Sequence, residues 1–318
     1  MLNIEAKYRA NLSDFLNLNL GSVNINDTQG NPFQPDVNFR GFAASPVLGT
    51  PQGISVYVDG VRVNEAFGDT VNWDLIPKSA ISSMTLLPGS NPVFGLNTLG
   101  GALTINTKNG FQDPGTELRV SGGSFGRQLY EFETGGHGER ADYFVTANLF
   151  DDKGWGQHNP SRVNQLFAAT GYRGNSTQLQ ASFTYADTKL SANQALPTSF
   201  FNDPAQAYTF PDVTANRLAF FNLKGSHAPT EDVQIAANAY YPFWRHFLTT
   251  YDLIIFDFRN HGENVPVEPS NHHYAQLARD LELVVKRVRS ELGEKPTAGI
   301  FHSMSARTAM KHALETGW

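Results

Sequence analysis

The sequence contains no cysteine among its 318 residues. This absence excludes disulfide bonds, thiolate metal sites and a cysteine nucleophile. Positive charge is also scarce, because 24 lysines and arginines stand against 30 aspartates and glutamates, for a formal net charge of −6. Without a long basic run to hold phosphates, the sequence argues against a nucleic-acid-binding protein.

Long hydrophobic runs are missing as well. No stretch approaches the roughly 18 consecutive apolar residues of a membrane-spanning helix. Strands that cross a membrane escape this test, because their apolar residues alternate with polar ones. Residues 1–20 have no basic start followed by an apolar stretch, so we expect no signal peptide in them.

The chain changes character near residue 241. Residues 1–241 are rich in Gly, Asn, Thr, Ser and Phe, and short alternating segments are separated by turn residues. This pattern is typical of antiparallel β structure, whereas residues 242–318 read as strand, helix, strand and helix. No linker rich in glycine, serine or proline marks the change. We interpret it as an abrupt join between two pieces that were not selected together, which predicts a chimera.

Hairpin signals and paired glycines are the main features of the first hundred residues. Asp59 and Gly60 lie between the alternating segments 54–58 and 61–63, and Asp-Gly in that setting predicts a tight hairpin. Gly100 and Gly101 precede a strand and favour a close backbone approach. Four blocks follow one another: NFRGF (38–42), VYVDGV (56–61), PGSNPVFG (88–95) and GGALTI (100–105).

In order and spacing these four blocks resemble the plug domain of TonB-dependent receptors. The alternative is a soluble β-rich domain with ordinary Asp-Gly and Gly-Gly turns. The resemblance implies a plug inside a large barrel, an outer-membrane location, the TonB energy-coupling complex as partner, and a small-molecule ligand such as a siderophore or another large nutrient. It implies no cofactor. Two features depart from the family pattern: Leu20-Gly21 replaces its usual Pro-Gly, and no TonB-box segment is visible.

The resemblance also suggests roles for individual plug residues. Arg40 and Gly41 match the family's Arg-Gly block, which packs inside the plug, so we expect Arg40 to be buried and hydrogen-bonded. For Asp59 and Gly60 we expect a turn and nothing more. Gly100 and Gly101 are assigned a structural role in the same way.

Residues 116–241 show the pattern of barrel strands. The expected strands are 116–124, 127–137, 141–151, 163–172, 176–187, 216–226 and 231–241. Each has about the 9–11 residues that a tilted membrane strand needs. Plugged transporters have about 22 strands, so we expect that seven strands alone cannot form a transporting barrel.

The longest connection in this region, residues 188–215, is rich in aromatic side chains. Phe200, Phe201, Tyr208 and Phe210 are candidate ligand contacts, because long loops of such barrels face outward. An interfacial aromatic girdle or packing within the loop is the alternative.

Residues 242–318 resemble the centre of α/β-hydrolases. DFRNHG (257–262) is similar to a loop block of that family, and FHSMSA (301–306) is similar to its nucleophile elbow, although Phe301 stands where the elbow needs a small residue. By this resemblance Ser303 is the candidate nucleophile and Met304 donates a backbone N–H to the oxyanion hole. The alternative is a generic βαβ unit with a solvent-facing serine.

A serine nucleophile needs a histidine base and an orienting carboxylate. His312 and Glu315 follow Ser303, but both fall on the helix that leaves the elbow, where neither can reach the serine. We therefore expect no hydrolase activity, and an α/β-hydrolase fragment is retained only as the alternative function.

The sequence thus predicts a mixed fold. Residues 1–110 form an α+β plug, residues 111–241 a partial antiparallel β-barrel sheet of about seven strands, and residues 242–318 an α/β-hydrolase-like fragment. The main functional prediction is a fragment of an outer-membrane uptake receptor that does not function as a chimera. No metal site is expected.

Overall fold

The computed structural model describes residues 2–3, 16, 21–26, 29–191, 196–208, 212–230 and 233–244. The chain divides into two units, Met1–Thr250 and Tyr251–Trp318, and every described residue belongs to the first. The predicted hydrolase fragment, with Ser303 and Met304, lies outside the described residues, except that the last described strand runs to Trp244.

Two small sheets build the first part of the chain. The three-stranded sheet contains β2 (Val23–Asn26), β3 (Asp36–Phe39) and β4 (Phe42–Ala44) in that order. The five-stranded sheet has the order β1 (Leu2–Asn3), β7 (Ile81–Pro88), β8 (Gly101–Thr107), β5 (Ile54–Val58) and β6 (Val61–Arg62). Strands β5 and β8 are parallel, and the other pairs are antiparallel.

One apolar core joins these two sheets. Phe39 from the three-stranded sheet packs with Val56, Met84 and Leu103 from the five-stranded sheet, and Trp73 completes the cluster. The connecting segments contribute the short 3₁₀ helices η1 (Trp73–Leu75), η2 (Lys78–Ala80) and η3 (Pro92–Phe94). We call this part the plug. Its described residues form strands and 3₁₀ helices, with Leu16 as the one α-helical residue, so the helical part of the predicted α+β class is not found there.

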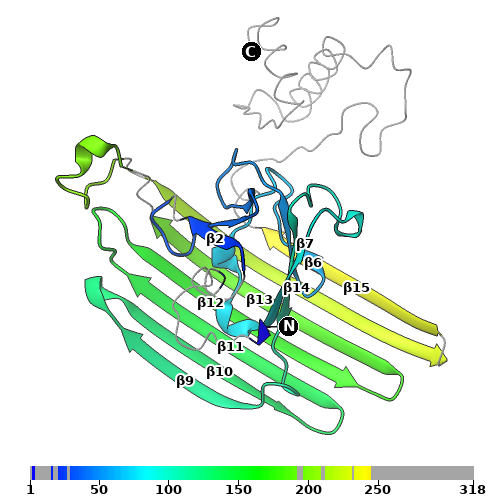
Figure 1. The fold of residues 1–318 in the computed structure, drawn as a ribbon. Coiled ribbons are helices and arrows are strands. Elements are labelled where there is room, and N and C mark those ends of the chain that lie inside the picture. The colour runs from blue at the N-terminus through cyan, green and yellow to red at the C-terminus, as the bar shows by residue number, and fades with distance from the viewer. Residues whose placement is uncertain are drawn as a thin grey trace, which may run out of the picture. The chain divides into compact units, whose positions relative to one another are not determined.

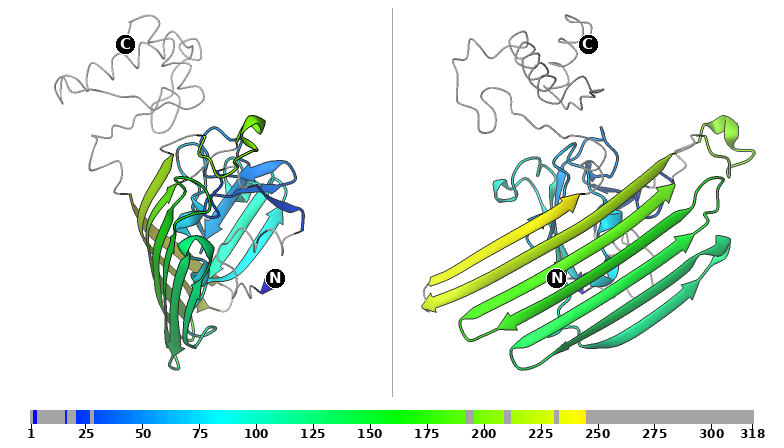
Figure 2. Two further views of the ribbon diagram at one scale, coloured as in Figure 1. Left: turned by 90° about the vertical axis from the view of Figure 1, so that its left-hand side faces the viewer. Right: turned by 180° about the vertical axis from the view of Figure 1, so that it is seen from behind.

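A seven-stranded antiparallel meander follows, which we call the wall. Its strands are β9 (Gly115–Gly122), β10 (Gln128–His137), β11 (Ala141–Asp152), β12 (Ser161–Arg173), β13 (Thr177–Ser191), β14 (Val213–Thr230) and β15 (Val233–Trp244). The plug lies against one face of the wall (Figures 1 and 2). Each of the seven strands overlaps one predicted range, and β12 to β15 extend beyond theirs.

The two faces of the wall have opposite chemistry. On β11, Phe144, Thr146 and Asn148 point toward the plug and are buried, whereas Tyr143 and Leu149 point away and are half exposed. The outward face of the other wall strands up to β14 carries the exposed residues Leu118, Val120, Tyr130, Phe132, Leu166, Tyr172, Leu179, Phe183, Phe221 and Leu223. On β15 side chains of both faces are exposed, among them Tyr240 and Tyr241. The wall therefore presents an apolar outer face. Its inner face is more polar but also holds two apolar clusters, one around Phe144 and Phe167 and one around Leu129 and Phe150.

The two ends of the wall also differ. The short turns 138–140 and 174–176 lie at one end, and the connections 123–127 and 153–160 lie at the other, with residues 196–208 between β13 and β14 (Figure 1). Near the long-connection end, cross-strand ion pairs bound the apolar outer face: Asp151–Arg162 at 3.2 Å and Asp187–Arg217 at 2.7 Å. Short turns at one end and long loops at the other are typical of outer-membrane barrels.

Among the described residues, no helix has the length and apolar character needed to cross a membrane.

Candidate functional site

A row of polar side chains crosses the inner face of the wall, and we call it the polar belt. Its members are Arg119 (β9), Glu131 (β10), Asn148 (β11), Gln165 (β12), Thr188 (β13) and Asn216 (β14). The register places the first four opposite one another in sequence, and it pairs Thr188 with Asn216. Arg119 donates to Glu131 at 2.6 Å, and Asn148 donates to Gln165 at 3.2 Å. These bonds lie within the wall and do not involve the plug.

The plug rests on the polar belt through the segment that contains η1 and η2. The Asp74 carboxylate oxygen Oδ2 accepts hydrogen bonds from Thr188 at 2.6 Å and from Asn216 at 3.0 Å. The backbone oxygen of Asp74 accepts a third bond from the Gln165 amide at 2.7 Å. One plug residue therefore holds three neighbouring wall strands together.

A second group of contacts surrounds η2. Lys78 lies 3.8 Å from Glu131, and Thr146 donates to the Ser79 hydroxyl at 2.7 Å. Further along, Lys108 pairs with Glu133 at 2.8 Å, just before the chain enters the wall. The wall accordingly supplies glutamates to the two lysines of the plug and a hydroxyl to Ser79.

Burial changes the ionisation of two plug carboxyls. Asp74 is only 1% exposed, its partners are all neutral, and its oxygen Oδ1 has no hydrogen-bond partner. Burial raises the pKa of Asp74 above its ordinary value, against the opposing effect of the bonds from Thr188 and Asn216. Burial likewise raises the pKa of Glu65 to about 7, although the Asn72 amide favours its charged form.

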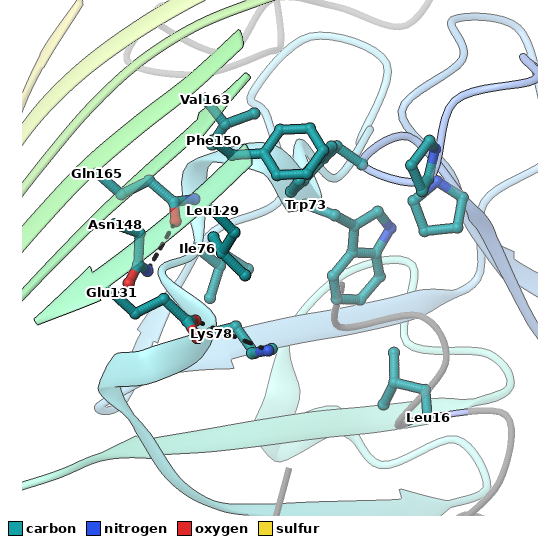
Figure 3. A pocket seen from close by; sticks show the side chains of 13 residues that line it. Leu16, Trp73, Ile76, Lys78, Leu129, Glu131, Asn148, Phe150, Val163 and Gln165 are labelled. Atoms are coloured by element: carbon teal, nitrogen blue, oxygen red, sulfur yellow. Dashed lines mark hydrogen bonds and ion pairs between the residues drawn. The ribbon is translucent and has the colours of Figure 1, made fainter. Parts of the chain in front are cut away.

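A small cavity lies between the plug and the wall (Figure 3). Its volume is about 30 Å³, which suffices for one or two water molecules and for nothing larger. Trp73, Ile76 and Lys78 line it from the plug, and Glu131 and Asn148 line it from the wall. The buried oxygen Oδ1 of Asn148 has no protein partner, so a water in this cavity has an acceptor ready. The cavity belongs to the docking contact and is too small for a nutrient.

The predicted turn at Asp59 and Gly60 is present, and it also contacts the wall. The turn joins β5 to β6, with φ values of 49° and 85°. The Asp59 carboxylate accepts bonds from the Thr107 hydroxyl at 2.6 Å and from Lys224 on β14 at 3.2 Å. Its backbone oxygen accepts a bond from Asn238 on β15 at 3.2 Å. Asp59 therefore fastens the plug to the last two strands of the wall, a role that the sequence did not reveal.

The prediction of a buried, hydrogen-bonded Arg40 is wrong. Arg40 and Gly41 form the two-residue turn between β3 and β4, with φ values of 51° and 86°. The tip of a tight hairpin projects into solvent, so Arg40 is exposed and its guanidinium stacks on the adjacent Phe39 ring at 5.0 Å. The Arg-Gly block is a hairpin turn of the same kind as Asp59-Gly60.

The paired glycines lie where other residues would collide. Gly101 has a φ of 155°, and a Cβ there would approach the Leu87 backbone oxygen to 2.4 Å. A Cβ on Gly100 would meet the Phe42 side chain at 2.5 Å. Both glycines let a loop of the plug fold tightly against β7 and β4.

Three plug loops gather at the end of the molecule where the long wall connections lie. The loops are residues 45–53, 63–72 and 89–100, and we call them the apical loops. Strand β8 follows the third loop and runs toward the first residues of the wall, which lie beside the short turns. The N-terminal end of β8, and the third loop before it, therefore lie at the end of the long connections. Parallel pairing of β5 with β8, and the return of β6, bring the other two loops to the same end.

Hydrogen bonds hold the apical loops to one another. The backbone N–H of Val71 donates to Ser45 at 2.9 Å, and that of Leu99 donates to Gly53 at 3.0 Å. Asp69 accepts bonds from Arg62 at 2.8 Å and from the Asn97 amide. The three loops therefore form one connected surface.

Five apolar side chains project from this surface, and we call them the apical patch: Leu48, Phe67, Val93, Leu96 and Leu99. Val93 and Leu96 are each 85% exposed, and the other three are also exposed. Leu48 lies directly over the backbone of Gly68, beside Phe67. Exposed apolar side chains held in place by a bonded framework are the usual mark of a contact surface.

The predicted aromatic contacts lie on the longest wall connection. Phe200 and Tyr208 pack edge to face, with ring centroids 5.5 Å apart, and Phe201 is exposed. Packing within the loop thus accounts for two of the four aromatics. Phe210 lies outside the described residues.

No group of three histidine, aspartate or glutamate side chains in the described part of the chain could hold a metal ion.

Comparisons with known proteins agree with this architecture. Residues 2–102 match the family model described as the TonB-dependent Receptor Plug Domain. The prediction of such a plug in the first part of the chain is therefore confirmed.

Solved structures show the same fold over plug and wall. The unliganded ferric citrate transporter FecA superposes with a TM-score of 0.59 at 14% identity, over 73% of this chain and 37% of that one. The siderophore receptor PiuA from Acinetobacter baumannii gives 0.54 at 16% identity, over 73% and 34%. The ferric yersiniabactin uptake receptor FyuA from Yersinia pestis gives 0.52 at 16% identity, over 72% and 38%. The chain spans little more than a third of the length of these proteins.

Proposed function

We propose that this protein acts in the outer membrane as a TonB-dependent uptake receptor. The observation that carries the proposal is the reversed polarity of the wall, which has apolar side chains outside and a more polar inner face covered by the plug. In water such an outer face would be an aggregation surface, whereas in a bilayer it is the favourable one. The plug match over residues 2–102 supports the same function.

Orientation follows from the two ends of the wall. Short turns face the periplasm and long connections face outward in barrels of this kind. The apical loops then face the outside, where they can meet a ligand, and the Asp59 turn faces the periplasm. We infer that the TonB energy-coupling complex is the partner on the periplasmic side, because the plug match is to a TonB-dependent family.

The ligand proposed at this level is a small molecule. The similar structures are named for ferric citrate, siderophores and ferric yersiniabactin, and each is a receptor or transporter of a small chelate. From these names only the broad class, a small-molecule ligand, is proposed for this chain.

The hydrolase reading of residues 242–318 stays a prediction, because Ser303 and Met304 lie outside the described residues. The chimera and the inability of the chain to transport alone also stay predictions, because no observation on the described residues supports them. No feature of the plug or wall favours an enzyme.

Cysteine labelling tests the orientation cleanly, because the chain has no cysteine of its own. Ser199→Cys lies on the longest wall connection, and Asn175→Cys lies in a short turn at the other end. We expect a membrane-impermeant maleimide to label Ser199→Cys in intact cells and to label Asn175→Cys only after lysis. Labelling of both variants in intact cells, or recovery of the protein outside the outer-membrane fraction, would contradict the proposal.

A further inference from the structure

The outward face of the wall carries its charged side chains at one margin. Alternate residues of each strand point away from the plug, in keeping with the pairing register of the wall. When lysine, arginine, aspartate and glutamate are counted, the charged residues at outward positions of β9 to β15 are Asp151, Arg162, Asp187, Lys189 and Arg217. All of them lie on β11 to β14 beside the long connections, and we call them the rim patch.

The register brings the rim patch together across four strands. Asp151 lies opposite Arg162, and Arg162 lies opposite Lys189. Asp187, which precedes Lys189 on the same face of β13, lies opposite Arg217. Residues directly opposite one another on one face of a sheet have Cβ atoms about 4.5–5.5 Å apart. The three cations and two anions therefore share one small area of the outward face.

The position of the rim patch along the strands places it at the level of lipid headgroups. On β12, Arg162 and Tyr172 are the first and last outward residues, and only uncharged side chains point outward between them. At roughly 3.3 Å per residue and a tilt near 40°, these ten residues rise about 25 Å along the membrane normal, which is the height of the apolar band of an outer-membrane barrel. With Tyr172 at one interface, Arg162 lies at the other.

The opposite margin of the outward face has a different composition. Tyr143 and Tyr172 lie there, and no lysine, arginine, aspartate or glutamate of the described strands points outward beside the short turns. The connections beyond the rim patch carry both signs of charge, with Lys153 on one and Asp203 on another. Among the described outward positions, the margin beside the long connections is therefore the one that offers cations to headgroups.

The cations of the rim patch have hydrogen-bond donors to spare. Lys189 is exposed, and it has no ion-pair partner among the described residues. The side chain of Arg162 is 68% exposed and contacts Asp151 through Nε at 3.2 Å, which leaves the other N–H groups of its guanidinium available. Arg217 donates from Nε and Nη2 to Asp187 and keeps Nη1. Phosphate suits such a group of donors, because it offers several charged acceptor oxygens.

We propose that the rim patch binds the phosphate of a lipid headgroup, with Arg162, Lys189 and Arg217 as its donors. The inference rests on the proposed function, because it requires the wall to lie in a membrane. In the proposed orientation the lipid belongs to the outer leaflet. The two aspartates hold the arginines in place, so these donors lose little freedom when the phosphate binds.

Titration of the purified full chain in a nonionic detergent tests the proposal, with bound lipids counted by native mass spectrometry. The phosphate probe is dioleoylphosphatidic acid, and dioleoylglycerol is the matched lipid that lacks the phosphate. We expect the phosphate lipid to bind at least about tenfold more tightly than dioleoylglycerol. Inorganic phosphate at the same concentration should not displace it, because the free ion has no acyl chains to cover the neighbouring apolar face, which includes Leu166 and Phe183.

A pair of substitutions locates the site. Arg162→Gln with Lys189→Gln removes two cations from the rim patch, and the fold does not depend on them because both side chains are exposed. We expect this variant to bind dioleoylphosphatidic acid at least about tenfold more weakly and dioleoylglycerol as the wild type does. The matched control is Arg140→Gln with Lys153→Gln, which removes the same two charges from exposed positions outside the rim patch and should bind both lipids like the wild type.

The outcomes separate this inference from the uptake function. Equal affinity of the wild type for the two lipids overturns the phosphate site, and displacement by inorganic phosphate overturns the lipid as its source. An unchanged affinity in the rim variant, or an equal loss in the control variant, overturns the assignment to the rim patch. Because binding is measured in detergent, these results stand whichever orientation the maleimide labelling shows, and a supported orientation does not rescue failed lipid binding.

Discussion

At the scale of single residues, Asp74 is the most unusual side chain of the plug. It is a buried carboxyl whose partners are neutral and whose second oxygen is unpaired. Its pKa is raised by burial, so the folded state binds the proton more tightly than the unfolded state. Its contribution to stability is therefore present at low pH and is lost as the pH rises above the ordinary aspartate value of 3.8.

Two substitutions at Asp74 should have opposite effects. Asp74→Asn keeps an acceptor for Thr188 and Asn216 but cannot ionise, so we expect higher stability than the wild type at pH 8 and little difference at pH 4. Asp74→Leu leaves both partners unsatisfied and should cost about 1–3 kcal/mol at either pH. Urea unfolding at the two pH values measures both effects. A stability difference between wild type and Asp74→Asn that does not grow with pH would refute the raised pKa.

Glu65 makes a second pH-dependent contribution to the stability of the fold. Its pKa of about 7 lies above the ordinary value of 4.5, so the stability that it contributes falls as the pH rises from 4.5 through 7. We expect Glu65→Gln to remove this part of the pH dependence, as seen in unfolding free energies between pH 4 and pH 8. Because the Asp74 charge helps to raise the pKa of Glu65, the effect should shrink in an Asp74→Asn background.

At the scale of the elements, the strands follow from local pattern and the contacts between them do not. Alternation along residues 141–151 predicts a strand, and β11 occupies almost the same range. The docking role of Asp74 depends on the pairing register of three wall strands, which brings Gln165, Thr188 and Asn216 together from distant parts of the sequence. Single-sequence reasoning has no access to that register.

Arg40 shows a different reason for failure. A resemblance to a family block suggested a buried arginine, but the two positive φ values at positions 40 and 41 mark a hairpin tip. The same Arg-Gly pair between Phe39 and Phe42 could have been read as a turn, as Asp59-Gly60 was. Local turn chemistry was the better guide at this position.

The outer face of the wall yields a prediction that distinguishes lipid from water. Phe183 lies near the middle of β13, points outward and pairs with Phe221 on β14. Phe183→Lys should cost about 2–4 kcal/mol if this face contacts the bilayer core, because a lysine there loses its hydration. Arg162→Lys, at the charged margin of the same face, is the control and should be neutral. Folding titrations into lipid vesicles measure both, and an equally mild Phe183→Lys would indicate a face in water.

At the scale of the whole molecule, the question is whether the plug leaves the wall during uptake. Thr146 lies on the inner face and is fully buried beneath Ser79 of the plug. We expect a Thr146→Cys variant to react with a small maleimide at least about tenfold faster in energised cells with TonB than in cells without it, because only displacement of the plug uncovers the residue. Ser199→Cys should react equally in both strains. Equal rates for Thr146→Cys would mean that the plug stays docked.

The polar belt affects the free-energy cost of separating the plug from the wall. Separating two apolar surfaces exposes both of them to water, which is strongly unfavourable. The contact between plug and wall contains both polar and apolar groups. The amides and hydroxyls of the polar belt can exchange a protein partner for a water molecule at little net change, whereas the apolar clusters around Ala80 and Phe33 cannot. Separation of the plug from the wall should therefore cost less at the polar belt than at these two apolar clusters.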